Sequence, residues 1–403
     1  MIASSNFFLS QFYRAANAVI APTLVVDLVL DTEQLGLLSG AFFYGFALTQ
    51  IPITLLLDRI GPRRMMGCLS LIGIGGAFLF SWAQGFGTGL VGRVILGVGM
   101  ACNLMGTLKL LTVWFGPLRF ATLSGIVFSI GTLGNMAATS PFVFLVDLMG
   151  WRPAFRMIAL TNLLVVAAFY VVVRDRPAKS APSSSGDASP STASGSTSHL
   201  RLLLKKKEFW IISISSMASY GVFGAFQTLW AGPYLMEAMG FSPMLCGHLI
   251  LLMNAGFLIG PTLWGILSDR LFKTRKWIVA GGLVGFSALT GGLALIEAGT
   301  LPWVFAVIFL CYGLMRGTGS LMYTHIKELM PLQMAGTAMT GINFFTMMGP
   351  AVFLQGLGKV MQAFYPAASR GQEAFAVGFL LCAGCLAGIS VLYAFTQDTK
   401  SSK

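Results

Sequence analysis

Charged residues are scarce in this sequence, and negative ones are the scarcest. Asp, Glu, Lys and Arg make up only 10% of the 403 residues, and Asp and Glu together number 14. An average soluble domain carries roughly a quarter charged residues, so this chain lacks the side chains to cover a soluble surface of its size. Its mean hydropathy is +0.78. These properties indicate an all-α protein that is solvated by a lipid bilayer.

The sequence also lacks the marks of a catalytic or metal site. All six cysteines lie in apolar blocks, and the pair Cys382 and Cys385 has no basic or polar neighbour that would activate a thiolate. We therefore expect packing cysteines without disulfides. We find no phosphate loop, metal cluster or catalytic triad in the sequence. Our prediction is a protein that is not an enzyme and has neither cofactor nor metal.

Apolar residues come in twelve blocks that are long enough to cross a bilayer as helices. A segment rich in Ser, Ala and Pro divides them into six and six, and its composition is typical of a flexible linker. We therefore predict twelve transmembrane helices in two pseudo-symmetric halves. The predicted spans are 6–30, 34–57, 64–84, 87–113, 120–147, 152–173, 208–236, 243–268, 277–297, 301–329, 336–364 and 372–396. The expected parts are 1–177 (first half), 178–207 (cytoplasmic linker and basic segment), 208–397 (second half) and 398–403 (cytoplasmic tail).

The net charge of +12 belongs to short basic clusters between the apolar blocks, so we expect no nucleic-acid binding. With the N-terminus inside, seventeen Lys and Arg residues fall on the cytoplasmic side and three on the outer side. Basic residues are retained on the cytoplasmic side of a membrane, so we expect both termini to be cytoplasmic. Since the loops are short and the sequence carries no organelle signal, we expect a bacterial inner membrane.

Two equivalent turns, one in each half, indicate an internal repeat. Asp58-Arg59-Ile-Gly-Pro-Arg63-Arg64 follows the second span, and Asp269-Arg270 with further bases follows the eighth. Lys109 in the fourth span and Lys327 in the tenth form a second matched pair. The first turn resembles the signature of the major facilitator superfamily, and the second turn resembles its degenerate copy. The stretch from Arg93 to Ala101 in the fourth span resembles another motif of that family.

This resemblance implies an alternating-access carrier whose halves rock about a central cavity, and a monomer. In such a carrier the acid of the signature turn could pair with bases across the interface and hold one state closed, although the bases could also serve only to set topology. We expect Arg93 to have a structural or coupling role, and Lys109 and Lys327 either a gating role or positions at the membrane surface. The predicted switch and gate residues are Asp58, Arg59, Arg63, Arg64, Arg93, Lys109, Asp269, Arg270 and Lys327.

Charges inside the spans are costly and therefore mark functional positions. Six bases lie within spans, whereas every acid falls near a span end or in a loop. This imbalance predicts an electropositive cavity and an anionic solute. Arg14, with Tyr13 and Asn17 beside it, lies about 12 Å into the first span if the helix begins near residue 6. An Arg there resembles the anion-binding Arg of several organic-anion and phosphate-ester branches of the family.

Other candidates for solute contact come from the later spans. Arg316 lies near the middle of the tenth span beside Gly317 and Gly319, which allow close approach of a helix or ligand. Tyr220, Gln227, Trp230 and Tyr234 have helical spacing and predict a polar aromatic stripe on the seventh span. Asn343 adds an amide in the eleventh span. The predicted solute-contacting residues are therefore Tyr13, Arg14, Asn17, Tyr220, Gln227, Trp230, Arg316 and Asn343.

His248 and His325 are the titratable candidates for proton coupling. A histidine at a helix end can also be simply hydrogen-bonded, and exchange with a counter-ion or facilitated flux needs no such group. For Lys359 we expect a side chain that reaches toward the membrane surface.

Three functions compete at this point. The first is a carrier of a small organic anion, with membrane lipid and a coupling proton or counter-ion as its other partners. The second is a multidrug or metabolite exporter, which many Phe and Met residues favour, while the basic cavity and the absence of a Gly-Pro-rich fifth span oppose it. The third is a non-transporting membrane sensor or assembly factor. The sequence favours the first.

Overall fold

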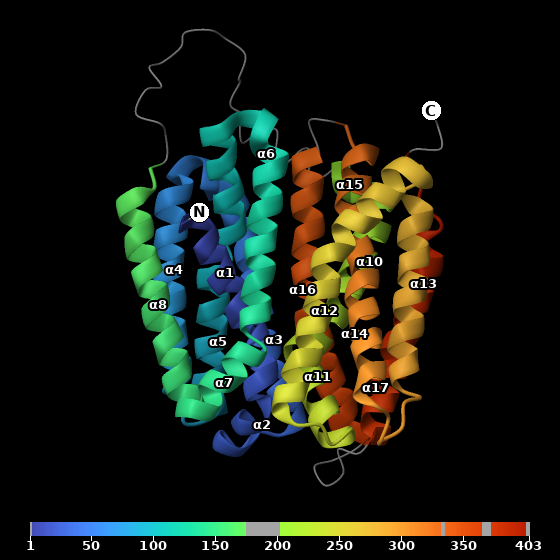
Figure 1. Ribbon diagram of the computed structural model, residues 1–403. Helices are drawn as coiled ribbons and strands as arrows, with labels where there is room; N and C mark the ends of the chain where they lie inside the picture. The colour runs from blue at the N-terminus through green and yellow to red at the C-terminus, as the bar shows by residue number, and fades with distance from the viewer. Residues whose placement is uncertain (1, 175–201, 332–334, 365–371, 400–403) are drawn as a thin grey trace.

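The computed structural model describes residues 2–174, 202–331, 335–364 and 372–399, and its regular elements are helices (Figure 1). Among the described residues, nine helices are long and apolar enough to cross a membrane, and one bent pair makes a tenth span. The first predicted span is broken into α1 and α2, and the eleventh is α16, which carries polar residues such as Asn343, Gln355 and Lys359. The predicted all-α membrane fold is confirmed.

The N-terminal half consists of α1 to α8. Its elements are α1 (Ile2–Ala15), α2 (Asn17–Asp27), α3 (Thr32–Ile60), α4 (Pro62–Ser81), α5 (Phe86–Met100), α6 (Asn103–Ala137), α7 (Ser140–Met149) and α8 (Trp151–Val172). α5 and the beginning of α6 form one apolar span, Phe86–Phe115, and the end of α6 forms another with α7 across a bend of 41°. Pro141 follows that bend directly.

The C-terminal half begins at Lys207. Its elements are α10 (Lys207–Ala225), η1 (Phe226–Trp230), α11 (Ala231–Pro233), η2 (Tyr234–Ala238), α12 (Pro243–Ile266), η3 (Leu267–Leu271), α13 (Lys276–Leu293), α14 (Pro302–Arg316), η4 (Gly317–Gly319), α15 (Ser320–Leu329), α16 (Ala335–Phe364) and α17 (Gln372–Tyr393). Here η1, η2 and η3 are π-helical turns, and η4 is a 3₁₀ turn. The seventh span is therefore irregular in its second half, the eighth at its end and the tenth near its middle.

The two halves lie side by side, with the blue-to-green helices on one side of the bundle and the yellow-to-red helices on the other (Figure 1). The end of α8 and the beginning of α10, which flank residues 175–201, lie at the same end of the bundle as the end of α17 (Figure 1). We call this the linker end. Most of the predicted linker, 178–207, falls outside the described residues.

The halves pack together mainly through α3 and α16, and further through α12 with α7 and α2 with η1. At the end opposite the linker these contacts are close. A Cβ on Gly36 would stand 2.6 Å from the Leu354 carbonyl oxygen, and one on Gly232 would stand 2.6 Å from that of Ala18. Pro22 has no N–H to bond the Ala18 carbonyl four residues earlier, so that carbonyl is available where Gly232 approaches. Small residues thus join the halves at this end.

Candidate functional site

Two arginines from opposite halves converge on one tyrosine ring. The Cζ atom of Arg14, at the end of α1, lies 5.5 Å from the centroid of the Tyr220 ring, and that of Arg316, at the end of α14, lies 4.9 Å from it. Because both distances are measured to the same centroid, the two guanidinium carbons lie no more than about 10 Å apart. Arg14 is 7% exposed and Arg316 is 5% exposed. The structure thus brings three of the predicted solute-contacting residues together.

Arg14 is held from its own half. Asn135 of α6, with its amide oriented to satisfy both neighbours, accepts a hydrogen bond from Arg14 Nη2 at 3.3 Å and donates to the Gln11 carbonyl at 3.0 Å. Arg14 Nε is buried without a partner. Since α1 begins at Ile2, Arg14 lies about 18 Å along the helix. The helix begins four residues before the start that the apolar block suggested.

Arg316 has no hydrogen-bond or ion-pair partner in the part of the chain that the structure describes. Its guanidinium lies over the Tyr220 ring and 5.8 Å from the centroid of Phe257. α14 ends at Arg316, and the 3₁₀ turn Gly317–Gly319 follows. The guanidinium folds back over this turn, where a Cβ on Gly319 would stand 1.8 Å from Arg316 Nη1. The glycine therefore provides the space that this side chain occupies.

A polar network connects α10, which carries Tyr220, with α15 and α16. The Tyr323 hydroxyl of α15 contacts Asn343 Oδ1 at 3.1 Å and Thr346 Oγ1 at 3.0 Å, and Thr346 bonds Ser216 of α10 at 2.6 Å. Asn343 was a predicted site residue. Tyr323, Thr346 and Ser216 were missed because a hydroxyl in an apolar block gives little signal unless its partner is known.

Arg93 is a third buried arginine, and its partners are all within the N-terminal half. Nη1 donates to the Tyr13 carbonyl at 3.2 Å, and the guanidinium lies 5.3 Å from the Phe42 ring centroid and 5.6 Å from that of Phe80. It therefore ties α5 to the α1 backbone one residue before Arg14. The structural or coupling role expected for Arg93 stays a prediction.

The other predicted solute contacts point elsewhere. The Tyr13 ring packs against Phe155 of α8, and Asn17 donates to Ser39 Oγ at 2.6 Å, so both face the interior of the N-terminal half. Gln227 donates to Asn254 Oδ1 of α12 at 2.6 Å. Trp230 is buried in η1, and its Nε1 has no partner in the described chain. Asn254 was missed in the sequence.

The stripe predicted for the seventh span does not form one face. The Tyr234 hydroxyl donates to the Leu293 carbonyl of α13 at 3.0 Å, and its ring packs against Phe379 of α17. Tyr220 meets the two arginines instead. The prediction assumed α-helical spacing, whereas the π-helical turns η1 and η2 change the angle between successive residues.

The second signature turn builds an ionic network within the C-terminal half. Arg275 contacts Asp269 at 2.9 Å and Glu328 of α15 at 3.0 Å, and its backbone N–H donates to Asp398 at 3.1 Å. Burial lowers the pKa of Arg275, but the hydrogen bond and charge of Glu328, together with Asp269, raise it above its ordinary value. Arg270 and Lys327 are exposed. Arg275, one of the further bases that follow Asp269-Arg270, is the centre of this network.

The first signature turn is described in part. Arg63 Nη2 donates to the Tyr170 carbonyl of α8 at 2.6 Å, and Arg64 is exposed. The side chains of Asp58 and Arg59 lie outside the described part of the structure. Lys109 is half-buried in α6. The roles predicted for these residues stay predictions.

The two histidines lie apart from the central arginines. His325 is buried in α15, where Nδ1 lies 2.7 Å from the Tyr393 hydroxyl and Nε2 lies 2.8 Å from the Gln397 carbonyl. A carbonyl only accepts, so Nε2 carries the proton and Nδ1 accepts from the tyrosine. His248 is exposed near the start of α12. His325 therefore connects α15 to the end of α17.

Lys359 is exposed and pairs with Glu33 across the two halves at 3.5 Å. Tyr44 of α3 also donates to Gln355 of α16 at 2.7 Å. These bonds reinforce the α3–α16 contact.

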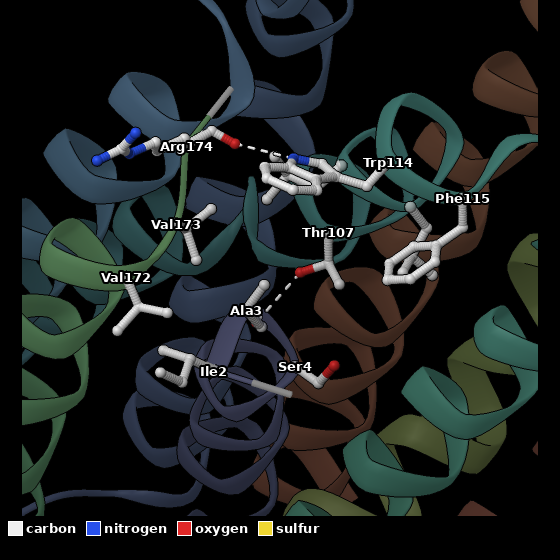
Figure 2. Close-up of a pocket in the computed structure, with 11 residues that line it drawn as sticks. Ile2, Ala3, Ser4, Thr107, Trp114, Phe115, Val172, Val173 and Arg174 are labelled. Carbon is white, nitrogen blue, oxygen red and sulfur yellow. Dashed lines mark hydrogen bonds between the residues drawn. The ribbon is translucent and has the colours of Figure 1, made fainter. Parts of the chain in front are cut away.

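A cavity of about 350 Å³ lies within the N-terminal half at the linker end, between the beginning of α1, α6 and the end of α8 (Figure 2). Two hydrogen bonds join residues that line this cavity. Trp114 donates to the Arg174 carbonyl at 2.9 Å, and Thr107 donates to the Ala3 carbonyl at 3.1 Å. Its lining is mostly apolar, and it includes none of the predicted solute-contacting residues.

Comparisons with known proteins agree on one class. The chain is 28% identical over 422 residues to the "Probable sulfoacetate transporter" of Cupriavidus necator, covering 98% of this chain and 94% of that protein. It is 24% identical to the "Hexuronate transporter" of Bacillus subtilis over 84% of this chain and 82% of that one. A crystal structure of a bacterial homologue of the human lysosomal transporter Spinster, inward-facing and unoccupied, matches with a TM-score of 0.81 and 19% identity, covering 98% and 95% of the two chains.

The fold, its apolar helices and these relatives define a helical membrane transporter rather than an enzyme. Residues 3–354 match the model of the Major Facilitator Superfamily. The chain belongs to that superfamily.

Proposed function

We propose that this protein carries a small organic anion across the bacterial inner membrane by alternating access, and that Arg14 and Arg316 bind the anion. The observation that carries the proposal is the convergence of these two buried guanidinium groups, one from each half, on the Tyr220 ring. Guanidinium groups bind carboxylates, sulfonates and phosphates through two parallel N–H bonds. An anion between them would contact both halves at once.

The charges around the pair support an anion as the occupant. No described carboxylate forms an ion pair with either arginine, and the described ion pairs involve acids at helix ends, namely Asp27, Glu33, Asp269 and Glu328. A buried charge without a partner is costly. A bound anion would supply the missing countercharge, whereas a lipophilic cation, as expected for a multidrug exporter, would be repelled.

The relatives point in the same direction. One is named as a sulfoacetate transporter and another as a hexuronate transporter, and both solutes are organic anions. The proposal therefore rests on the site chemistry and on the names of relatives that match most of the chain.

We further propose exchange or facilitated flux in place of carboxylate-coupled proton symport. No described acid contacts the arginine pair, and both ring nitrogens of His325 are engaged by Tyr393 and Gln397. A pH gradient imposed on proteoliposomes should then leave uptake unchanged. Uptake that follows the gradient would require a titratable group at the site.

The position of the chain in the membrane is also part of the proposal. The flanks of the linker and the described C-terminal residues lie at one end of the bundle (Figure 1). The basic residues of both signature turns lie beside helix ends, as expected for the cytoplasmic side. We propose cytoplasmic termini and a monomer, with membrane lipid around the exposed apolar side chains.

Uptake of radiolabelled sulfoacetate or glucuronate into proteoliposomes tests the function. Arg14→Gln and Arg316→Gln should each lower kcat/KM by about 100-fold, as expected for removal of one partner of a buried charge pair. Lys206→Gln also removes one positive charge, but at an exposed position, and it should transport normally. If both arginine variants transport normally, the arginine pair does not bind the solute. Transport of lipophilic cations alone would favour the exporter.

A further inference from the structure

We infer that the solute is a short dianion whose two anionic groups are separate, one held by Arg14 of the first half and the other by Arg316 of the second. This inference rests on the proposed function and narrows its solute class. The two guanidinium groups approach the same Tyr220 ring from different helices, α1 and α14. The solute would therefore bridge the two halves.

The first argument is the count of charges. Two guanidinium groups are buried here, and the described residues provide neither with an ion pair. A monoanion neutralises only one of them and leaves the other buried and uncompensated, which is costly in a low-dielectric site. A dianion neutralises both.

The second argument is the free bonding capacity of each arginine. Asn135 occupies one nitrogen of Arg14, and Nε of that residue has no partner. Arg316 has a buried, unpartnered Nε and makes no hydrogen bond with any described residue. Each guanidinium can therefore offer N–H donors to a separate oxyanion group, and binding one group does not use up the other arginine.

The third argument is distance. The guanidinium carbons lie no more than about 10 Å apart, because both are measured to the same ring centroid, and each charge-assisted N–H···O bond takes up about 2.8 Å between its heavy atoms. This upper limit admits a solute with a few carbons at most between its anionic groups. The Tyr220 ring attracts both cations.

A phosphate monoester concentrates two charges on one group, whereas a diacid or a carboxy-sulfonate offers a separate oxyanion to each guanidinium. The N–H donors that remain free on both arginines favour the second arrangement. Sulfoacetate has the required chemistry, since its carboxylate and its sulfonate are both ionised at neutral pH and are separated by one carbon. Succinate and glucarate extend the same pattern to longer chains.

Matched pairs of ligands test the inference. Each pair contains a dianion and the monoanion in which one anionic group is replaced by a hydroxymethyl group: sulfoacetate with isethionate, succinate with 4-hydroxybutyrate, and glucarate with gluconate. Binding to the purified full-length protein is measured by isothermal titration calorimetry, together with thermal stabilisation. At least one dianion should bind about tenfold or more tightly than its monoanion partner.

The variants assign that preference to the two arginines. In Arg316→Gln and in Arg14→Gln, the dianion should bind no more than about threefold better than its partner, because one cation remains. Arg316→Lys keeps the charge and should retain part of the preference. Lys206→Gln, the exposed control, should behave as the wild type.

The possible outcomes distinguish a failure of this inference from a failure of the proposed anion-carrier function. If monoanions bind the wild type as tightly as their dianion partners and the arginine variants still weaken binding, the carrier function survives and the two-group inference is wrong. If phosphate monoesters bind best, the two arginines share one group, which also contradicts it. If none of these anions binds, both proposals fail.

Discussion

The interior of the N-terminal half and the interface between the halves both contain buried arginines, but these arginines have different partners. Arg93 lies in the interior, donates to the Tyr13 carbonyl and is covered by two phenylalanine rings of its own half. Arg14 and Arg316 lie at the interface over a shared tyrosine ring, and Arg316 has no hydrogen bond within the described chain. The contrast is that Arg14 contacts a ring of the other half, whereas the contacts of Arg93 all lie within its own half.

Glycines show the same contrast. In the interior, a Cβ on Gly97 would stand 2.0 Å from the Phe42 carbonyl oxygen of the same half. At the interface, one on Gly36 would stand 2.6 Å from the Leu354 carbonyl oxygen of the other half. The first contact holds a half together, whereas the second holds two halves in one of their relative positions.

The largest effect is expected from Gly97→Ala. The added methyl meets backbone, so α3 and α5 must separate, and overpacking of this kind costs about 1–3 kcal/mol or more. We expect a fall in Tm of about 5 °C or more in detergent, with loss of transport in proportion to the loss of folded protein. Gly75→Ala, where the methyl meets nothing within 4 Å, is the control. An unchanged Tm for Gly97→Ala would contradict the close packing inside this half.

A smaller effect is expected from Gly36→Ala, since the halves can separate there without unfolding. Tm should change by less than about 2 °C. Hydrogen exchange in Thr32–Gly40 and Ala351–Lys359 should increase several-fold, because α3 and α16 separate more often at the end opposite the linker. Transport should slow. Gly356→Ala in α16, whose methyl meets nothing within 4 Å, should show neither change. If Gly36→Ala unfolds the protein, the fold depends on the contact between the halves as much as on the contacts inside the N-terminal half.

The smallest effect is expected from Gly319→Ala. The methyl would collide with the flexible end of Arg316, so the guanidinium moves and the backbone does not. We expect an unchanged Tm and an anion affinity about fivefold to tenfold weaker, because the group is displaced and not removed. Gly281→Ala, with open space around it, is the matched control for calorimetry. Full affinity in Gly319→Ala would show that the position of Arg316 does not matter to binding.

Much of the fold could be predicted from the sequence because the bilayer imposes a length and a composition on each span. The arginine pair could also be anticipated in part. A charge in an apolar block is conspicuous, and this feature singled out Arg14 and Arg316, which the structure then places at one tyrosine.

The remaining details depend on geometry that periodicity does not encode. The π-helical turns of the seventh span send Tyr234 to α13 and Gln227 to Asn254, so helical spacing predicted the wrong common face. Lys359 has a partner 326 positions earlier in the sequence, in Glu33, and no local pattern predicts such a pair. Tyr323 was missed because its importance follows from Asn343 and Thr346 on another helix.

The central claim is that Arg14 and Arg316 together bind the solute, and a structure of the wild-type protein with sulfoacetate tests it most directly. We predict one anionic group within about 3 Å of each guanidinium, with the ligand beside the Tyr220 ring. Sulfoacetate bound in the cavity at the linker end, or beside only one of the two arginines, would contradict the account.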